Sequence, residues 1–143
     1  MASNITRTGD LIIPDVYSED VVANVMWLQE KLSFSDEYVA QLIGVTNELL
    51  CKWRKREATL TGSQLKTLEN LWSAMNRLLS YFNFRRDLMM RVLEARFSDQ
   101  IHRTKSTPPW VGTSLRDFMM LQGRPGIYEV ECWVWHIRSA NSD

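Results

Sequence analysis

The chain has 143 residues, of which 45% are hydrophobic and 24% charged, which is typical of a globular protein with one core or two small lobes. Its formal net charge is zero, so a nucleic-acid interface would have to be a local patch. The only cysteines, Cys51 and Cys132, form neither a zinc-binding spacing nor a disulfide framework, and we expect reduced thiols in a cytoplasmic protein.

The charges are unevenly distributed along the chain. Residues 1–37 contain two basic and seven acidic residues, whereas residues 44–105 contain twelve basic and six acidic residues. The first residues lack the apolar region of a signal peptide, and the longest apolar runs are far too short to span a membrane. The basic middle of the chain is therefore where we look for an anionic partner.

The N-terminal part predicts an arm followed by one helix. Residues 1–17 have no helical or strand pattern, and we expect a flexible arm there. Residues 18–32 predict a helix with Ser18 as its N-cap and acidic residues in the first turn. Its apolar face has helical spacing and consists of Val21, Val25, Leu28 and Leu32.

Two short helices are predicted next, at residues 36–43 and 47–56. Gly44 ends the first helix, since glycine accepts the left-handed conformation of a helix C-cap at no steric cost. Thr46 is the expected N-cap of the second. The apolar positions are Val39, Leu42 and Ile43 in the first helix, and Leu49, Leu50 and Trp53 in the second.

A long amphipathic helix is predicted over residues 61–82. Thr61 and Gln64 form a capping box that marks its start. Its apolar stripe consists of Leu65, Leu68, Trp72, Met75 and Leu79. We expect the helix to continue over residues 84–97 after a kink, with Leu88, Val92 and Leu93 buried.

The remaining residues predict an irregular linker and two helices. Pro108 and Pro109 interrupt any helix in residues 98–112, which we take as the boundary between an N-terminal and a C-terminal lobe. Residues 114–121 predict a short helix. Residues 127–138 fit helical spacing but are rich in β-branched and aromatic residues, so a strand is the alternative to the helix we favour.

These elements predict an all-α fold: a helical bundle containing a helix-turn-helix, followed by a small helical C-terminal lobe. The domains expected are the arm at 1–17, a DNA-binding unit at 18–97, and a linker with a partner-binding or dimerisation lobe at 98–143.

The helix-turn-helix prediction rests on four spacings. Two steeply crossing helices need a small residue where they meet, a glycine in the tight turn, and apolar residues that hold the second helix. Ala40 is the small residue, and Gly44 follows four positions later. Leu50 lies six positions beyond Gly44, and Trp53 three beyond Leu50.

The other face of the second helix would then meet the major groove. Amide, carboxylate and ammonium groups near the start of such a helix can bond base edges, and the candidates are Asn47, Glu48, Cys51 and Lys52. The expected phosphate contacts are Thr46, Arg54, Lys55, Arg56 and Lys66. We expect Asn47→Ala and Lys52→Ala to weaken specific binding, and Arg54→Ala and Arg56→Ala to weaken binding to every sequence.

Two alternatives stay open at this point. The same pattern would suit an αα-hairpin inside a bundle, with basic residues that only complement the helix dipole. A second basic set suggests a solvated helix face, although a secondary phosphate contact or an acidic partner would also fit; it consists of Arg77, Arg85, Arg86, Arg91 and Arg96.

No catalytic pattern is found, and we expect neither an enzyme nor a metal or cofactor. His102 and His136 have no convincing ligand or nucleophile partner nearby in the sequence, and no phosphate-binding glycine loop is present.

The C-terminal residues carry more aromatic and methionine side chains than one small core needs. Phe118, Met119, Met120 and Leu121 are consecutive, so they cannot all face one core. We expect an interface with a second copy or another protein, formed by Trp110, Phe118, Met119, Tyr128, Trp133 and Trp135.

The sequence resembles the Xre/MbcA/ParS-type antitoxins. EYVAQLIGVTNELLCKWRKR is similar to their helix-turn-helix, with a small residue, Gly-Val, a hydroxyl residue, an apolar pair and Trp. The C-terminal half is similar in layout, with a Pro, an apolar residue and Gly, a Ser-led helix, a Gly and a last helix with a central Val. The matching positions are Pro109, Val111, Gly112, Ser114, Leu115, Gly123 and Val130.

The resemblance implies a homodimer that represses its own promoter and binds a cognate toxin, often a toxin with a RES domain that acts on NAD. The toxin would then carry the chemistry. The alternative is a protein-interaction module, toxin-neutralising or scaffolding, in which the helix-turn-helix is only architectural.

Overall fold

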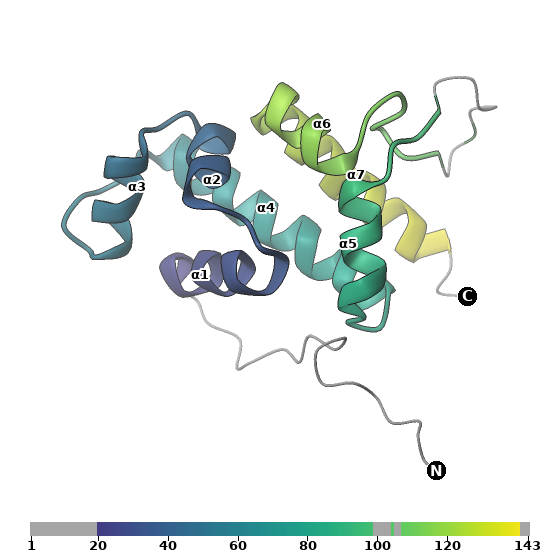
Figure 1. The fold of residues 1–143 in the computed structure, drawn as a ribbon, viewed down its shortest axis with the longest axis horizontal. Coiled ribbons are helices and arrows are strands. Elements are labelled where there is room, and N and C mark those ends of the chain that lie inside the picture. Colours follow the sequence, from purple (N-terminus) through teal and green to yellow (C-terminus); the bar gives the residue numbers. More distant parts are fainter. Residues whose placement is uncertain (1–19, 99–103, 105–106, 141–143) are drawn as a thin grey trace, which may run out of the picture.

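The computed structural model describes residues 20–98, 104 and 107–140, and the predicted arm with Ser18 lies outside this part (Figure 1). The described residues form an all-α fold with no strand, which confirms the predicted fold class. This described part contains seven helices: α1 (Val21–Leu32), α2 (Asp36–Ile43), α3 (Asn47–Arg54), α4 (Gly62–Tyr81), α5 (Arg86–Glu94), α6 (Leu115–Gln122) and α7 (Arg124–Ala140). None of these helices combines the length and apolar composition that a membrane crossing requires.

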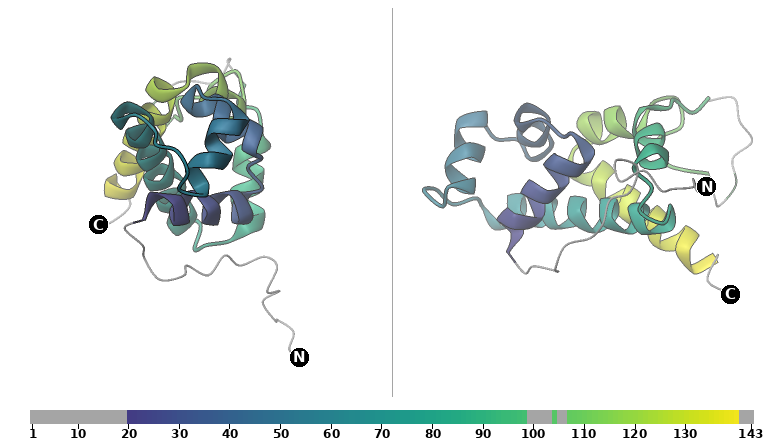
Figure 2. Two further views of the ribbon diagram at one scale, coloured as in Figure 1. Left: turned by 90° about the vertical axis from the view of Figure 1, so that its left-hand side faces the viewer. Right: turned by 60° about the horizontal axis from the view of Figure 1, so that its bottom comes forward.

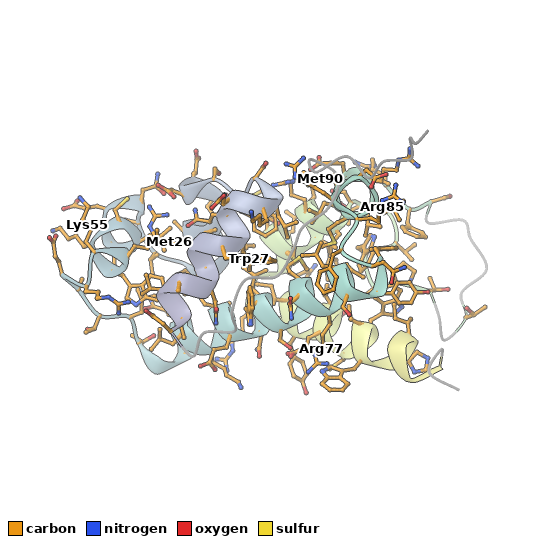
Figure 3. The ribbon with its side chains drawn as sticks, turned by 90° about the horizontal axis from the view of Figure 1, so that it is seen from below. Met26, Trp27, Lys55, Arg77, Arg85 and Met90 are labelled. Carbon is orange, nitrogen blue, oxygen red and sulfur yellow. The ribbon has the colours of Figure 1, made fainter. Side chains whose placement is uncertain are left out.

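Helix α4 is the centre of the fold. It contacts α1, α2, α5 and α7, and it runs through the middle of the molecule in Figure 1. Because it is covered on several sides, its buried residues exceed the single predicted stripe; Leu71, Ala74 and Leu78 are buried as well. Trp27 of α1 lies against α4 (Figure 3), with its ring centroid 5.2 Å from that of Trp72.

The helix starts follow the predicted capping residues, with one exception. Ser35, Thr46, Thr61 and Ser114 each accept a hydrogen bond from a backbone N–H in the first turn, and Thr61 and Gln64 form the expected capping box. The N-cap of α1 is Asp20 rather than Ser18. Its carboxylate accepts from the backbone N–H of Val22 at 3.0 Å, so the N-cap lies two residues later than predicted and the helix begins at Val21.

The prediction that one helix continues over residues 84–97 was wrong. Asn83 and Phe84 have φ angles of 55° and 60°, and the backbone N–H of Phe84 donates to the carbonyl of Leu79 at 2.7 Å. This turn reverses the chain, so α5 is a separate, shorter helix that packs back on α4 and α1. Its fully buried residues are Met89 and Leu93.

The C-terminal segment shares one hydrophobic core with the rest of the molecule. Helix α7 packs along α4, and Ile127, Val130, Val134 and Ile137 are buried as predicted. Residues 127–138 therefore belong to a helix, and the strand alternative was wrong. The irregular stretch before α6 separates the two segments along the sequence, but their apolar side chains form a continuous cluster.

Helices α2 and α6 are joined by a buried tyrosine. The Tyr38 hydroxyl donates to the backbone carbonyl of Arg116 at 2.7 Å, and its ring packs against Phe34 with 5.1 Å between centroids. Burial raises the pKa of Tyr38 above its ordinary range. This contact ties the short helices α2 and α3 to the C-terminal segment.

Gly44 adopts the left-handed conformation in the turn between α2 and α3, and Gly62 provides a matched control. Gly44 has a φ angle of 75°, whereas Gly62 begins α4 without a positive φ, and a Cβ atom would meet nothing within 4 Å at either position. We expect Gly44→Ala to lower the free energy of unfolding by about 1–2 kcal/mol, because a Cβ disfavours the left-handed conformation. Urea denaturation should show Gly62→Ala to be neutral or stabilising; equal effects of the two substitutions would contradict this account.

Candidate nucleic-acid interface

The turn between α2 and α3 is closed by backbone and capping hydrogen bonds. Gly44 ends α2 in the left-handed conformation, and the N–H of Val45 donates to the carbonyl of Ala40 at 2.9 Å. The Thr46 hydroxyl then accepts from the N–H of Leu49 at 3.1 Å. Ala40, the small residue of the predicted pattern, is buried. The turn thus sets the direction in which α3 leaves α2.

Helix α3 has a buried and an exposed side. Leu50 and Trp53 are buried and Leu49 is half-buried, as their spacing predicted. We call the exposed side the α3 outer face; its residues are Asn47, Glu48, Lys52 and Lys55. Helix α3 lies at one end of the molecule and the end of α7 at the other (Figures 1 and 2). Figure 3 shows Lys55 at this extreme end.

The polar residues beneath α3 form what we call the Asp36 network, made of Gln29, Asp36, Cys51 and Arg54. Arg54 donates through Nη1 to Asp36 Oδ1 at 2.7 Å and to Gln29 Oε1 at 2.6 Å. Gln29 in turn donates to Asp36 Oδ1 at 2.8 Å, and the Cys51 thiol lies 3.8 Å from Asp36 Oδ2. These contacts connect α1, α2 and α3.

The Asp36 network changes two assignments made from the sequence. Arg54 was a predicted phosphate contact, but its half-buried guanidinium already binds Asp36 and Gln29. Cys51 was a predicted base-reading residue, but it is also half-buried and its thiol points to Asp36. Both residues therefore hold α3 in place instead of belonging to its outer face.

The same network stabilises the ionised form of Asp36. Hydrogen bonds from Arg54, and then from Gln29, lower the pKa of Asp36 from 3.8 to about 2. The hydrogen bond with Asp36 raises the pKa of Arg54 in return. The carboxylate and guanidinium thus stay charged and paired over the whole range from weakly acidic to basic pH.

The other predicted phosphate contacts differ in their surroundings. Arg56 follows α3 with a φ angle of 63°, and its exposed guanidinium pairs with Asp20. Lys52 is exposed and pairs with Glu48 one turn earlier, at 3.0 Å. Lys66 lies on α4, with Glu69 at 4.0 Å. Such exposed pairs are worth little and open readily when a stronger partner arrives.

Most of the second basic set has intramolecular partners. Arg86 donates to the carbonyl of Lys31, Arg85 pairs with Asp87, and Arg96 donates to the carbonyl of Gly112. The Arg77 guanidinium lies 3.5 Å from the ring centroid of Trp135. Arg77 and Arg86 thus connect different helices, the contacts of Arg85 and Arg96 are local or outside helices, and Arg91 is exposed on α5.

The predicted partner-binding set is divided by the structure. The assignment of Trp110, Phe118 and Met119 to a surface was wrong, because α6 and α7 bury them in the common core. Trp133 is half-buried, with its ring centroid 5.1 Å from that of Trp110. Tyr128 and Trp135 are exposed, by 57% and 49%.

Sequence reasoning missed several residues. Among the described residues, Leu121 is the most exposed large apolar side chain, at 74%, and Met120 is also exposed. The run of four apolar residues did indicate that some of them must face outward. Gln29 and Asp36 were missed as part of the α3 support. No local pattern marks them, since they meet Arg54 only through the tertiary fold.

Comparison with known proteins adds no assignment. The sequence matches no protein-family model, and no curated protein matches it. Within the described residues, no three His, Cys, Asp or Glu side chains come together as a metal site would require. His102 lies outside the described part, and His136 is exposed on α7.

The Asp36 network makes part of the stability depend on acidity. The pKa of Asp36 is lowered on folding, so its contribution is present above pH 4 and is lost as the pH falls toward 2. Because Asp36 is nearly half exposed, solvent screens its interactions. We therefore expect its ionised form to contribute on the order of 1 kcal/mol to the free energy of unfolding. Asp36→Asn should remove that acid-dependent part in urea titrations at pH 5 and pH 2.5.

A control for this experiment is Glu48→Gln, which removes a carboxylate from an exposed ion pair on the same unit. It should change the stability at pH 5 by a few tenths of a kcal/mol at most. If Asp36→Asn and Glu48→Gln behave alike at both pH values, the Asp36 network does not support α3.

Proposed function

We propose that this protein binds double-stranded DNA in a sequence-specific manner, with α3 in the major groove, and regulates transcription. The observation that carries the proposal is the arrangement of α3. One side of this helix is held by Leu50, Trp53 and the Asp36 network, while a polar outer face is presented at the end of the molecule. That is the arrangement needed by a helix that reads base edges.

Each residue of the outer face suits a different contact. Asn47 lies in the first turn, where its amide would bond adenine bidentately. Lys52 would bond guanine and Glu48 would accept from cytosine once their mutual ion pair opens. Thr46, Lys55 and Arg56 flank these residues at the two ends of α3 and would bind phosphates.

The support beneath α3 favours binding over a purely architectural role. A reading helix loses less entropy on binding when it is already fixed in the free protein. Arg54 and Cys51 contribute to this fixation from α3 itself, and Gln29 contributes from α1. The zero net charge does not oppose the proposal, because the exposed cations near α3 need only form a local patch.

A second candidate function, binding to another protein chain, is favoured by the exposed apolar residues of α6 and α7. Leu121, Tyr128 and Trp135 are exposed by 74%, 57% and 49%. Aromatic side chains are enriched at protein–protein interfaces. A homodimer through this surface would present two copies of α3 to half-sites about one helical turn apart. A cognate toxin, as implied by the antitoxin resemblance, is the other partner that would use it.

The DNA-binding proposal is tested by selecting bound duplexes from a random pool and measuring the affinity of variants for the selected site. We expect Asn47→Ala and Lys52→Ala to weaken binding to that site by about tenfold or more, since a bidentate base contact is worth about 1–3 kcal/mol. Binding of both variants to an unrelated duplex should change much less.

Lys55→Ala should weaken binding to every duplex. It should also reduce the slope of log affinity against log salt concentration by about one, the value expected for the loss of one phosphate contact. Arg91→Ala is the matched control, because Arg91 is an exposed arginine on α5. An unselective pool, or variants of the outer face that bind as well as Arg91→Ala does, would contradict the proposed docking of α3.

The self-association proposal is tested by sedimentation at several protein concentrations. Leu121→Ser combined with Trp135→Ser should convert a dimer formed through α6 and α7 to a monomer, because both changes remove exposed apolar area from these two helices. Met26→Ser is the control, since Met26 is similarly exposed on α1, on the outer side of the fold (Figure 3). A monomeric wild type at high concentration would leave this surface to a different protein.

A further inference from the structure

A pocket of about 480 Å³ lies between the first half of α4 and the start of α7. Its lining residues are Lys66, Asn70, Arg124, Pro125 and Tyr128. The volume falls in the range of small-molecule sites, roughly 300–1,000 Å³. The pocket lies on two helices that pack along each other, and it is open to solvent, since four of its five lining residues are exposed and only Asn70 is buried.

Asn70 gives this pocket an unusual polar wall. Its side chain is only 8% exposed, and within residues 20–98, 104 and 107–140 no side-chain hydrogen bond satisfies it. The fully enclosed side-chain polar atoms without a partner in the described part of the chain are the indole N–H groups of Trp27 and Trp110, so the Asn70 amide reaches the pocket surface. A carboxamide that opens on a pocket and bonds no protein side chain is available to a ligand.

The charged residues around Asn70 indicate the sign of the charge that a ligand would carry. Lys66 and Arg124 reach the pocket from two different helices, and none of its described lining residues carries a carboxylate. The nearest carboxylate to Lys66 belongs to Glu69, at 4.0 Å, and Arg124 donates to the Ser63 hydroxyl at the long distance of 3.5 Å. Neither contact neutralises the cations fully. The positive end of the α7 dipole lies at Arg124 as well, so an anion is favoured.

The remaining wall is apolar and partly flat. The Pro125 ring and the Tyr128 phenol ring line the pocket beside the two cations, and Tyr128 is 57% exposed. The volume is several times what a single phosphate ion would occupy, so the anionic group would be attached to a larger body. A flat ring would stack on the Tyr128 side chain.

We propose that the pocket lined by Lys66, Asn70, Arg124 and Tyr128 binds a small phosphorylated molecule with a flat ring. Its phosphate lies between Lys66 and Arg124 and accepts from the Asn70 amide, and its ring lies on Tyr128. This site is separate from the α3 outer face. It removes Lys66 from the set of residues assigned to DNA phosphates, and it gives the protein a place where a metabolite is bound.

The test uses the full chain and adenosine monophosphate as the probe, followed by calorimetry and by the side-chain amide signals of Asn70 in ¹⁵N NMR spectra. We expect saturable binding, a shift of the Asn70 signals, weaker binding of inorganic phosphate and no binding of adenosine. Lys66→Gln and Arg124→Gln should each weaken binding by about tenfold, as expected for the loss of a hydrogen bond to a charged group. Asn70→Asp should abolish it by placing a negative charge against the phosphate.

Arg91→Gln is the matched control, because it removes one exposed positive charge outside the pocket and should leave the affinity unchanged. Lys52→Ala should also leave it unchanged, which separates this proposal from DNA binding by α3. Failure of adenosine monophosphate to bind saturably would overturn the proposal. So would equal effects of Lys66→Gln and Arg91→Gln, or variants that weaken binding to duplex DNA alone, since the pocket would then serve the DNA backbone.

Discussion

The burial of α4 is the constraint on which the rest of the structure depends. Leu68, Met75 and Leu78 of this helix are fully enclosed by α1, α2, α5 and α7. Several of the surrounding helices have only eight or nine residues, and helices of that length are not stable alone in water. They persist because each covers part of α4 or of its neighbours. Helix α3, which does not lie along α4, is consequently left at the end of the molecule, with one side free.

The polar contacts beneath α3 complete this arrangement. Two buried apolar residues would hold such a short helix only loosely, and the Asp36 network adds charged hydrogen bonds from α1 and α2. Arg54, one of the residues predicted to contact phosphates, therefore acts inside the protein. The α3 outer face is smaller than predicted, because Cys51 and Arg54 do not belong to it. Its remaining residues carry an amide, a carboxylate and two ammonium groups.

Local signals predicted the helices well, whereas tertiary contacts decided the site. Capping residues such as Thr61 and Ser114 act within one turn, so they mark helix starts in any context. The reversal at Asn83 and Phe84 escaped prediction because non-glycine residues adopt the left-handed conformation there. Trp110 and Met119 were placed on a surface because composition cannot show that α7 packs along α4 and encloses them. Asp36 and Arg54 are eighteen residues apart, and only the fold brings them together.

The central claim is that the α3 outer face binds specific DNA, and the most direct measurement is a titration of fluorescent duplex from the gene's own upstream region at two salt concentrations. A scrambled duplex of equal length is the control. The account predicts tight binding that weakens with salt and prefers the upstream duplex. Binding to neither duplex, at low salt and high protein concentration, would contradict it and would leave α2 and α3 as an architectural part of the bundle.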